Sequence, residues 1–400
     1  MLAIRDELTA AAVMVELDGT VRRLVLFPPD LSREQLATVA QTADADVVVS
    51  DELIDVPLDV RLLNTTAIRD AGRELAPACE TEWILLTSGT TASPKLVEHT
   101  LASLTGAMNA GAHSGIVWGT FYDIRRYGGL QIFLRAVVAG TPLVLKGAQE
   151  GTGDFLYRAA QEGVTHILGT PSHWRSALMT GAADVITPRY VRLSGEVSDQ
   201  GILNQLRQQY SNAEVVHAFA TTEAGVGFTV EDGRMGAPRN ILTSNPAVEI
   251  KVQDGTLRIR SNRTATRYLN RGIKALKDDD GFVNTGDVVE EREGRLYFAG
   301  RKDGIINVGG LKVYPEEVEA VINRHPKVNG SLVKSKKSPI MGSLVVADVM
   351  LRNGFENTVE LRREILDFCR NELAHHKVPA AIHFITTLQV GAAGKLVRHA

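Results

Sequence analysis

Short apolar strands alternate with helical segments through the first half of the chain, and most of these strands run into turns rich in glycine, serine or threonine. This alternation constrains the fold more than any other feature, because strands joined through helices form mostly parallel sheets with helices on their faces. A helix is expected at residues 33–40. Strands are expected at residues 21–27, 46–50, 83–86, 166–168, 190–193 and 214–216. The sequence therefore predicts a large α/β domain.

The pattern changes after residue 247, where strand-like segments follow one another without helices. Residues 248–252 and 257–260 flank an Asp-Gly pair and predict a β-hairpin. A charged stretch then leads to Pro315, which is expected to begin a helix with acidic residues in its first turn. We therefore expect a large domain over 1–300, a linker over 301–310 and a small α+β domain over 311–400.

The composition argues against several classes of protein. The chain has 44 basic and 47 acidic residues, so its net charge of −3 gives no sign of nucleic-acid binding. No apolar run is long enough to span a membrane, and the amino terminus does not resemble a signal peptide. The two cysteines, Cys79 and Cys369, lack metal-type spacing, and their scarcity fits a reducing cytoplasm. We expect a cytoplasmic protein with no nucleic-acid partner and no membrane span.

Four segments carry candidate chemistry, and the first follows the strand at 83–86. Five hydroxyl side chains and one glycine lie between Leu86 and Lys95. Such a turn can bind a polyphosphate through its N–H groups and hydroxyls, and Lys95 adds positive charge. The segment lacks the Gly-Lys-Ser/Thr ending of a Walker A loop, and the alternative is a solvated loop.

The second segment, residues 217–223, continues from the strand at 214–216. The ring of Phe219 could stack on a base, and Thr222 could bind a phosphate. Glu223 is the type of ligand that Mg²⁺ accepts, since this ion takes oxygen ligands and often only one or two carboxylates. The alternative is a surface turn with a single carboxylate.

The third and fourth segments lie further along the chain. Asp287 follows a glycine turn and could accept hydrogen bonds from two ribose hydroxyls, and Arg301 could bridge ribose or phosphate. A hairpin turn and a charged linker are the alternatives. Lys395 follows Gly394 and precedes Arg398 by three residues, close to the carboxyl terminus. A lysine on such a tail is ordinarily solvated.

Taken together, in this order and spacing, the segments resemble the adenylate-forming superfamily of acyl-CoA synthetases, adenylation domains and luciferases. The family's hydroxyl-rich loop ends in Pro-Lys, as residues 87–95 do. Its Tyr-Gly-x-Thr-Glu stretch is similar to residues 219–223, and its Thr-Gly-Asp to residues 285–287. Its Gly-Arg-x-Asp stretch and its final Gly-Lys-x-x-Arg are matched by residues 300–303 and 394–398. The resemblance covers about residues 20–400, and its specificity lies in the ordered set rather than in any one motif.

The resemblance implies a fold and a set of ligands. The large domain would contain mostly parallel sheets with flanking helices and a distorted β-barrel-like subdomain, and the small domain would be mobile. The chain would use ATP, Mg²⁺ and either coenzyme A or the pantetheine of a carrier protein, with a small carboxylic acid as substrate. Fewer residues precede the hydroxyl-rich loop than is usual in the family. This implies a shortened first subdomain, with a homodimer contact or another polypeptide in place of the missing segment.

The resemblance also assigns roles to individual residues. Lys395 would be the catalytic lysine that bridges the attacking carboxylate and the α-phosphate, which Thr222 would also contact, while Glu223 would hold Mg²⁺. Asp303 matches the hinge about which the small domain rotates between two half-reactions. Gly309 and Gly310 match the loop that lines the pantetheine tunnel, with a plain turn as the alternative. The other residues expected to bind or border the nucleotide are Thr87, Ser88, Gly89, Thr90, Thr91, Lys95, Gly195, Glu196, Phe219, Ala220, Asp287 and Arg301.

Three stretches of the sequence depart from the family pattern. Ala92 stands where a glycine is usual, and Phe219-Ala220 replaces Tyr-Gly, which keeps the aromatic ring but loses its hydroxyl. The residues before Gly394 lack the usual hydroxyl side chains. These changes imply either lower activity or a narrow subfamily.

The acyl pocket is expected to include Tyr122, Arg126 and His217, and neighbouring aromatic residues at 118 and 121 favour an aromatic or medium-chain acid. Asp123 could pair with an α-amine or cap a helix, and we expect the cap. Arg125 and Arg126 could bind a second carboxylate of the substrate or lie in solvent, and we expect solvent.

These observations favour an acyl- or aryl-CoA synthetase. The alternatives are a ligase that transfers the acyl group to a carrier-protein pantetheine or to an amine, and a truncated nucleotide-binding relative without catalysis. The presence of Lys95, Glu223, Asp287, Arg301 and Lys395 together argues against the last of these.

Overall fold

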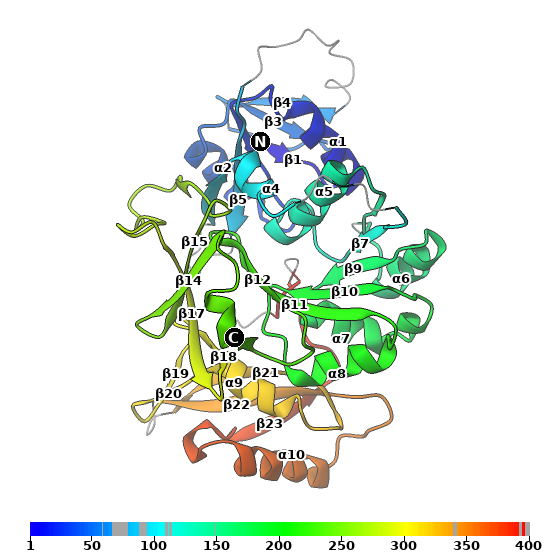
Figure 1. Ribbon diagram of the computed structural model, residues 1–400, viewed down its shortest axis with the longest axis vertical. Coiled ribbons are helices and arrows are strands. Elements are labelled where there is room, and N and C mark those ends of the chain that lie inside the picture. The colour runs from blue at the N-terminus through cyan, green and yellow to red at the C-terminus, as the bar shows by residue number, and fades with distance from the viewer. Residues whose placement is uncertain are drawn as a thin grey trace.

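The computed structural model describes residues 1–57, 59–65, 79–87, 94–108, 111, 114–147, 149–338, 342–391 and 394–396. Figure 1 shows an elongated molecule, with the amino-terminal lobe at one end and the small carboxy-terminal domain at the other. A parallel sheet and an antiparallel sheet lie between them, side by side. The predicted division into α/β and smaller α+β parts is confirmed. No helix in these ranges is long and apolar enough to cross a membrane.

The amino-terminal lobe contains two small sheets. A parallel sheet has the strand order β1-β3-β4, and a second sheet has the order β16-β6-β5-β2. Helix α2 begins at the predicted place, with Ser32 and Gln35 forming a reciprocal capping box. The elements are β1 (Leu2–Ala3), α1 (Glu7–Leu17), β2 (Arg23–Val25), α2 (Arg33–Thr42), β3 (Val47–Ser50), β4 (Arg61–Asn64), β5 (Glu82–Thr87), β6 (Lys95–His99), α4 (Leu101–Thr105) and β16 (Arg267–Tyr268).

The central sheet has the order β12-β11-β10-β9-β7-β8 and is parallel except for β12. Helices α6, α7 and α8 pack on one face through a core that includes Trp174, Val191 and Leu193, and α5 covers the other face through a cluster that includes Trp118 and Ile132. The elements are β7 (Trp118–Thr120), α5 (Tyr127–Ala139), β8 (Leu143–Val144), α6 (Thr152–Gln161), β9 (His166–Gly169), α7 (Pro171–Met179), β10 (Tyr190–Ser194), α8 (Gln200–Gln209), β11 (Glu214–Thr221) and β12 (Gly225–Val230). Strand β11 therefore extends beyond the predicted end at residue 216, because it continues to pair with β12.

The antiparallel sheet has the order β13-β18-β17-β15-β14 and shares a hydrophobic core with β12. The predicted hairpin is confirmed, with Asp254 and Gly255 in its turn at φ values of 52° and 72°. The strands are β13 (Ala237–Pro238), β14 (Val248–Gln253), β15 (Thr256–Ser261), β17 (Val283–Arg292) and β18 (Arg295–Arg301).

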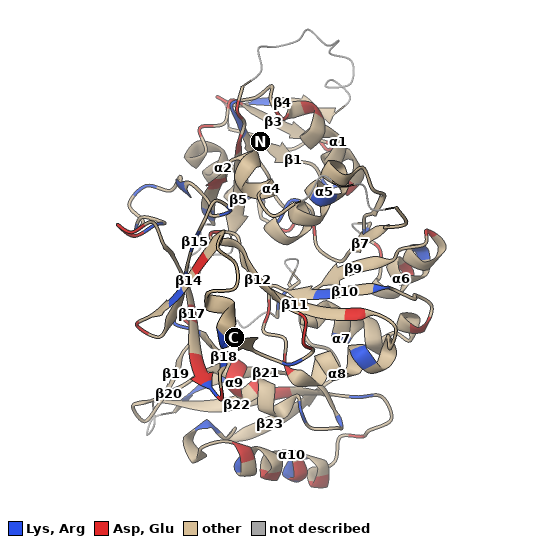
Figure 2. Ribbon diagram, viewed as in Figure 1, with Lys and Arg blue, Asp and Glu red and all other residues tan. Residues whose placement is uncertain are grey.

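The small domain has a hydrophobic core of its own, which includes Val318, Val333, Ala347 and Ile365. Its sheet has the order β21-β22-β23, and the β19–β20 hairpin contributes Ile306 to the same core. The elements are β19 (Ile306–Val308), β20 (Leu311–Val313), α9 (Pro315–Ile322), β21 (Val328–Ser338), β22 (Gly342–Leu351), α10 (Val359–Glu372) and β23 (Ala381–Ile385). Figure 2 shows acidic and basic residues interspersed along α10 and over the other lobes.

The segment before α5 corrects two expectations. Arg126 is the N-cap residue of α5, so the predicted cap by Asp123 is wrong. Asp123 instead accepts two side-chain hydrogen bonds from Arg125, of 2.7 and 2.8 Å. Arg125 is 1% exposed and also donates to the backbone carbonyls of residues 4 and 5, so its predicted place in solvent is wrong as well. This buried pair fixes the segment between β1 and α1 against the segment before α5.

Glu7 completes this cluster and is expected to give folding a distinctive pH dependence. Burial and the nearby charge of Asp123 raise its pKa from 4.5 to about 8, and its Oε2 is buried without a hydrogen-bond partner. The neutral carboxyl is therefore favoured in the folded state. Its contribution to stability is complete below pH 4.5 and is lost as the pH rises toward 8, by up to about 1.4 kcal/mol per pH unit.

Urea unfolding of Glu7→Gln across this pH range would measure the effect. The variant should lose this decline in the free energy of unfolding, because the amide cannot ionise. Glu16→Gln, at an exposed position of the same helix, is the control. An unchanged slope in Glu7→Gln would show that Glu7 is ionised in the folded protein.

Candidate active site

The hydroxyl-rich loop is closed by two residues that face each other across a strand pair. Thr87 ends β5 and is the direct partner of Lys95, the first residue of β6. Asn270 fixes this end of β6, because its side chain accepts a hydrogen bond from the Leu96 N–H at 2.7 Å and donates to the Pro94 carbonyl at 3.2 Å. Ser88, Gly89, Thr90 and Thr91 lie outside the described residues, as does Arg398.

Tyr268 connects Lys95 to Glu223. The Lys95 ammonium lies 5.5 Å from the centroid of the Tyr268 ring, and the Tyr268 hydroxyl donates a hydrogen bond of 3.3 Å to Glu223 Oε1. Burial and the negative charge of Glu223 raise the pKa of Tyr268, so its hydroxyl remains a donor. The structure thus brings the predicted phosphate-binding lysine and the predicted metal ligand to one place.

His99 fixes the backbone beside Glu223. Its Nε2 lies 2.7 Å from the Thr222 carbonyl, and its Nδ1 lies 2.9 Å from the Ser103 hydroxyl. Burial lowers the pKa of His99 to about 4, so the ring is neutral and its Nε2–H donates to the carbonyl. His99 therefore positions the turn that carries Thr222 and Glu223.

Asp287 and Arg301 face each other on neighbouring strands. They are direct partners of β17 and β18. Burial raises the pKa of Asp287 from 3.8 to about 6, although the charges of Arg301 and Lys395 oppose the rise. Burial alone would lower the pKa of Arg301, but Asp303, Asp287 and Glu223 together raise it. These charges therefore act on one another within a single site.

Asp287 is expected to make nucleoside binding pH-dependent. If it accepts hydrogen bonds from ribose hydroxyls, its ionised form binds, so affinity should fall as the pH drops through about 6. Affinity for adenosine, which carries no titrating phosphate, should be about tenfold weaker at pH 5 than at pH 8. Calorimetric titration would measure this. Asp287→Asn should remove the pH dependence, and the exposed Asp279→Asn should retain it. A flat profile in the unmodified protein would contradict the role.

The tail that carries Lys395 is held against the carboxyl ends of the central strands. The Thr170 hydroxyl donates a hydrogen bond of 2.5 Å to the Gly394 carbonyl. Glu196 accepts from the Leu396 N–H at 2.8 Å and from the Ser172 N–H of α7 at 2.9 Å. A Cβ at Gly195 would lie 3.7 Å from Lys395 Cε. The structure thus places Gly195, Glu196 and Lys395 together.

Gly394 cannot be replaced without disturbing this arrangement. Its φ is 71°, and a Cβ there would lie 2.1 Å from the ring of His173. His173 itself packs between Phe121 and Tyr122, with ring centroids 5.5 and 5.9 Å away. The tail therefore fits closely against α7.

The other residues predicted for the site contact side chains and backbone outside the Lys95–Glu223 and Lys395 groups. The Phe219 ring stacks on Phe298 and Phe228, with centroids 4.9 and 5.5 Å away, and Ala220 faces Val226 across the β11–β12 pair. His217 is buried and bonds through Nε2 to the Arg234 carbonyl at 3.0 Å. Gly309 and Gly310 form the two-residue turn between β19 and β20, both with positive φ, and Asp303 pairs with Arg301 at 3.1 Å.

The predicted acyl-pocket residues separate in the structure. The Tyr122 hydroxyl donates to the Ser194 carbonyl at 2.8 Å, which places it beside Gly195. Arg126 instead pairs with both carboxylate oxygens of Asp30 at 2.7 Å, so the expectation that it lies free in solvent is wrong. Phe121 packs with Phe155 and Trp174 in the core behind the sheet.

A buried polar interface joins the small domain to α7 and α8. Arg175 forms an ion pair with Asp199 and donates a hydrogen bond of 2.9 Å to the Asn329 carbonyl. Asn323 donates to the same Asp199 carboxylate at 3.1 Å and accepts from Ser331 at 2.9 Å. All five side chains are buried. A Cβ at Gly201 would lie 2.6 Å from the Asn323 carbonyl, so the two domains approach at backbone distance.

The sequence did not single out His99, Asn270, Tyr268, His173, Arg175 or Asp199. None of them lies in a glycine- and hydroxyl-rich turn, and their roles arise from contacts between distant parts of the chain. Thr170 carried a signal, because Gly169-Thr170-Pro171 follows a strand, and Thr-Pro is typical of a helix start.

Comparisons with known proteins agree with this geometry. A family model described as "AMP-binding enzyme" matches residues 8–264, and one described as "AMP-binding enzyme C-terminal domain" matches residues 317–395. The chain is 25% identical over 418 residues to a 2-succinylbenzoate–CoA ligase of Bacillus velezensis, covering 99% of this chain and 81% of that protein. It is 26% identical over 379 residues to the Listeria innocua protein of the same name, covering 90% and 79%.

Two solved structures share the fold. The amide bond synthetase McbA from Marinactinospora thermotolerans aligns with a TM-score of 0.82 at 21% identity, covering 99% of this chain and 87% of that one. The o-succinylbenzoate CoA synthetase MenE from Bacillus subtilis, in complex with the acyl-adenylate OSB-AMP, aligns with a TM-score of 0.78 at 20% identity, covering 99% and 86%. One fold is thus shared by a protein named for making amides and one named for making thioesters.

Proposed function

The chain belongs to the AMP-binding enzyme family, and from this we propose that it is an AMP-forming acid–CoA ligase. In the first half-reaction, a carboxylate oxygen of the substrate attacks the α-phosphorus of ATP, and the bond to the β-phosphate breaks to release pyrophosphate. In the second, the thiol of coenzyme A attacks the acyl carbon, and AMP leaves. The curated relatives named as 2-succinylbenzoate–CoA ligases support this class of reaction.

The observation that carries the proposal is the position of Lys395. Thr170 and Glu196 hold its loop against Gly195, and its charge reaches Asp287. We assign Lys395 to the negative charge that develops between the carboxylate and the α-phosphate. Thr222 would contact the same phosphate, and Lys95 with the Thr87–Thr91 loop would bind the pyrophosphate portion.

The other roles follow from the site's chemistry. Asp287 and Arg301 would bind the ribose, and Phe219 and Ala220 would border the base. Among the described residues, no three carboxylate, histidine or cysteine side chains form a metal-binding cluster. Glu223 would hold Mg²⁺ together with phosphate oxygens and water, since this ion often takes only one or two protein carboxylates. Tyr268 would orient the Glu223 carboxylate.

The acceptor of the acyl group has a second candidate besides coenzyme A. The fold is shared with an amide bond synthetase, so an amine or the pantetheine of a carrier protein is the second candidate. Gly309 and Gly310 match the family's loop beside the pantetheine tunnel, and this resemblance favours a pantetheine acceptor; in the arrangement described here they form the exposed β19–β20 turn. Asp303 would be the hinge between domains 1–300 and 311–400, with 301–310 as the linker.

We also propose a cytoplasmic location for the protein. Sedimentation would test whether it forms a homodimer.

Pyrophosphate exchange into ATP tests the first half-reaction. Carboxylic acids of each class, including 2-succinylbenzoate, would be supplied singly without coenzyme A. Exchange with one class would establish adenylation, and adding coenzyme A, a carrier protein or an amine would then identify the acceptor. No exchange with any acid, in folded protein that binds ATP, would leave the non-catalytic nucleotide-binding relative as the better description.

A further inference from the structure

The imidazole of His173 lies directly against the tail that carries Lys395. His173 is the third residue of α7 and is partly buried. Its ring stacks on Phe121 at an interplanar angle of 27° and meets Tyr122 edge to face at 72°. The three atoms nearest to a Cβ built on Gly394 are Cε1, Nε2 and Nδ1 of this ring. The side of the imidazole that carries both nitrogens therefore faces the tail.

The hydrogen bonds at the start of α7 fix the tautomer of this ring. Nδ1 accepts a hydrogen bond of 3.2 Å from the Thr170 N–H, while the Thr170 hydroxyl accepts one of 3.0 Å from the His173 N–H. An Nδ1 that accepts carries no hydrogen, so the neutral ring has its hydrogen on Nε2. Burial lowers the pKa of His173 to about 4, so the ring is neutral at pH 7. His173 therefore presents an Nε2–H donor.

This donor has no acceptor in the part of the chain that the structure describes. There, the bond from Thr170 is the hydrogen bond that the His173 side chain makes. His99 and His217 differ, because each bonds through Nε2 to a backbone carbonyl, at 2.7 and 3.0 Å. A partly buried N–H without an acceptor is unfavourable, and an oxygen of a bound molecule would remove that cost.

The donor lies beside the place where the acyl group would react. Gly394, which the ring faces, is followed by Lys395, and a Cβ at Gly195 would lie 3.7 Å from Lys395 Cε. Tyr122, on another side of the ring, donates to the Ser194 carbonyl at 2.8 Å. The imidazole is thus enclosed by the tail and by a side chain bonded to the end of β10. A carboxylate held by Lys395 would be within reach of its Nε2–H.

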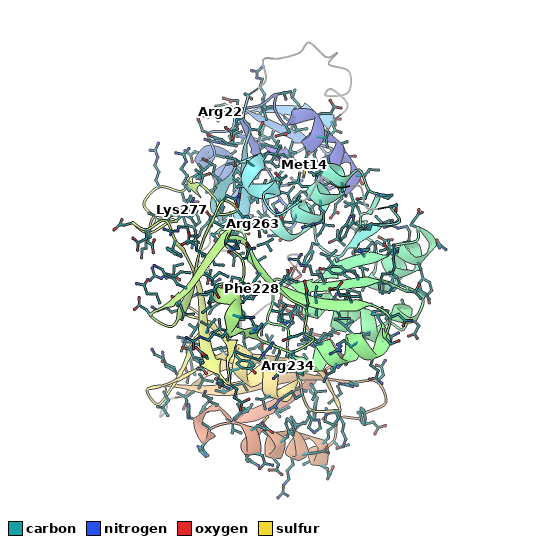
Figure 3. All side chains as sticks on the ribbon, viewed as in Figure 1. Met14, Arg22, Phe228, Arg234, Arg263 and Lys277 are labelled. Atoms are coloured by element: carbon teal, nitrogen blue, oxygen red, sulfur yellow. The ribbon has the colours of Figure 1, made fainter. Side chains whose placement is uncertain are left out.

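His173 differs from Lys395 in the domain to which it belongs. Helix α7 packs against the central sheet through a core that includes Trp174. In Figure 3, which labels Phe228 where the central and antiparallel sheets meet, α7 lies with the central sheet and not with the small domain. If the small domain rotates between the half-reactions, Lys395 leaves the site and the imidazole stays. The same donor would then serve both steps.

We propose that His173 is a further catalytic residue, which donates its Nε2–H to the acyl oxygen of the substrate. The inference rests on the proposed acid activation and adds a residue to it. In the first half-reaction, the bond would hold the carboxylate oxygen that does not attack phosphorus. In the second, the thiol loses its proton to water and its sulfur bonds to the acyl carbon. The acyl oxygen then takes a negative charge, which the donor stabilises until the bond to AMP breaks and the carbonyl re-forms.

Two substitutions separate the donor from the helix cap. The amide of His173→Gln can place an N–H near the position of Nε2. His173→Asn lacks that donor, but its Oδ1 can still accept from the Thr170 N–H. Acyl transfer to coenzyme A would be measured with the synthetic adenylate of the acid that gives the fastest pyrophosphate exchange. The Asn variant should have a kcat about 10²- to 10³-fold lower, whereas the Gln variant should stay within about tenfold of the unmodified protein.

The controls address a purely structural role. If His173 served only to cap α7, the Asn variant would be the more active of the two. His375→Asn, at an exposed position of the small domain, should behave as the unmodified protein. Both His173 variants should unfold thermally close to the unmodified protein. Should His173→Asn fail to fold, His173→Phe replaces it with the same expected loss, because it keeps a ring between Phe121 and Tyr122.

A bound analogue gives a readout that does not depend on turnover. In the acyl-sulfamoyl adenosine of the same acid, a hydrogen bond to the acyl oxygen lowers the carbonyl stretching frequency. The lower frequency should appear with the unmodified protein and with His173→Gln, and not with His173→Asn. Unchanged acyl transfer and an unchanged frequency in His173→Asn would overturn the role of His173 and leave acid activation standing. Pyrophosphate exchange with no acid at all would overturn acid activation itself.

Discussion

Replacing Lys395 by methionine is expected to reduce acid-dependent pyrophosphate exchange by about 10²- to 10³-fold. The loop that carries Lys395 is fixed by Thr170 and Glu196, so the variant keeps its backbone contacts and loses only the positive charge. That charge would act on the phosphate and carboxylate as they react, and its removal should lower kcat more than it raises KM.

Two further measurements make this result specific. Thioester formation from a synthetic acyl-adenylate should proceed in Lys395→Met at close to the original rate, because that step does not use the charge. Lys336→Met, at an exposed position of the same domain, should behave as the unmodified protein. Unchanged exchange in Lys395→Met would remove this lysine from the mechanism.

The second large effect is expected at the interface between the domains. Arg175→Met removes the partner of the buried Asp199 carboxylate and the hydrogen bond to Asn329. Removing one member of a buried ion pair costs about 3–5 kcal/mol. The pair lies within the large domain, but Arg175 and Asp199 each also bond to the small domain, through Asn329 and Asn323, so part of this loss should weaken the arrangement in which Lys395 meets the large domain. Exchange should therefore fall by about 100-fold or more, because fewer molecules have the domains docked.

The discriminating readout is again the second half-reaction. If the small domain rotates before thioester formation, synthetic acyl-adenylate should still react with coenzyme A in Arg175→Met. Asn323→Ala, which removes the small-domain side of the same network, should show a smaller loss with the same selectivity. Arg207→Met, at an exposed position of α8, is the control. Equal losses in both half-reactions would indicate general destabilisation of the fold.

The predictable part of the site follows from the ordered set of motifs. Taken singly, the segments with Glu223, Asp287 and Arg301 read as ordinary turns, and Lys395 as a solvated tail residue. Their order and spacing resemble the adenylate-forming superfamily, and that resemblance predicted that Lys95, Glu223, Asp287, Arg301 and Lys395 belong to one site. The helix starts at Ser32 and Pro315 were also readable, because their signals are local.

The rest depends on contacts that local sequence does not encode. Tyr268 reaches Glu223 only because β16 pairs with β6, and His99 reaches Thr222 from a strand more than a hundred residues earlier. Predictions from neighbouring residues were wrong where a side chain's partner comes from a distant part of the chain. Asp123 precedes a helix and resembles a cap, yet Arg125 is buried against the segment between β1 and α1, and Asp123 pairs with it instead.

The polar character of the contact between the small domain and α7–α8 bears on how the protein avoids aggregation. Hydrogen bonds from Arg175 to the Asn329 carbonyl and from Asn323 to Asp199 cross this contact, and both are directional. When such a contact separates, water can satisfy each exposed group at once. A hydrophobic interface of equal strength would expose an apolar patch each time the domains separate, and such patches promote association with neighbouring molecules. If the small domain rotates as proposed, this surface should therefore separate without becoming a site of self-association.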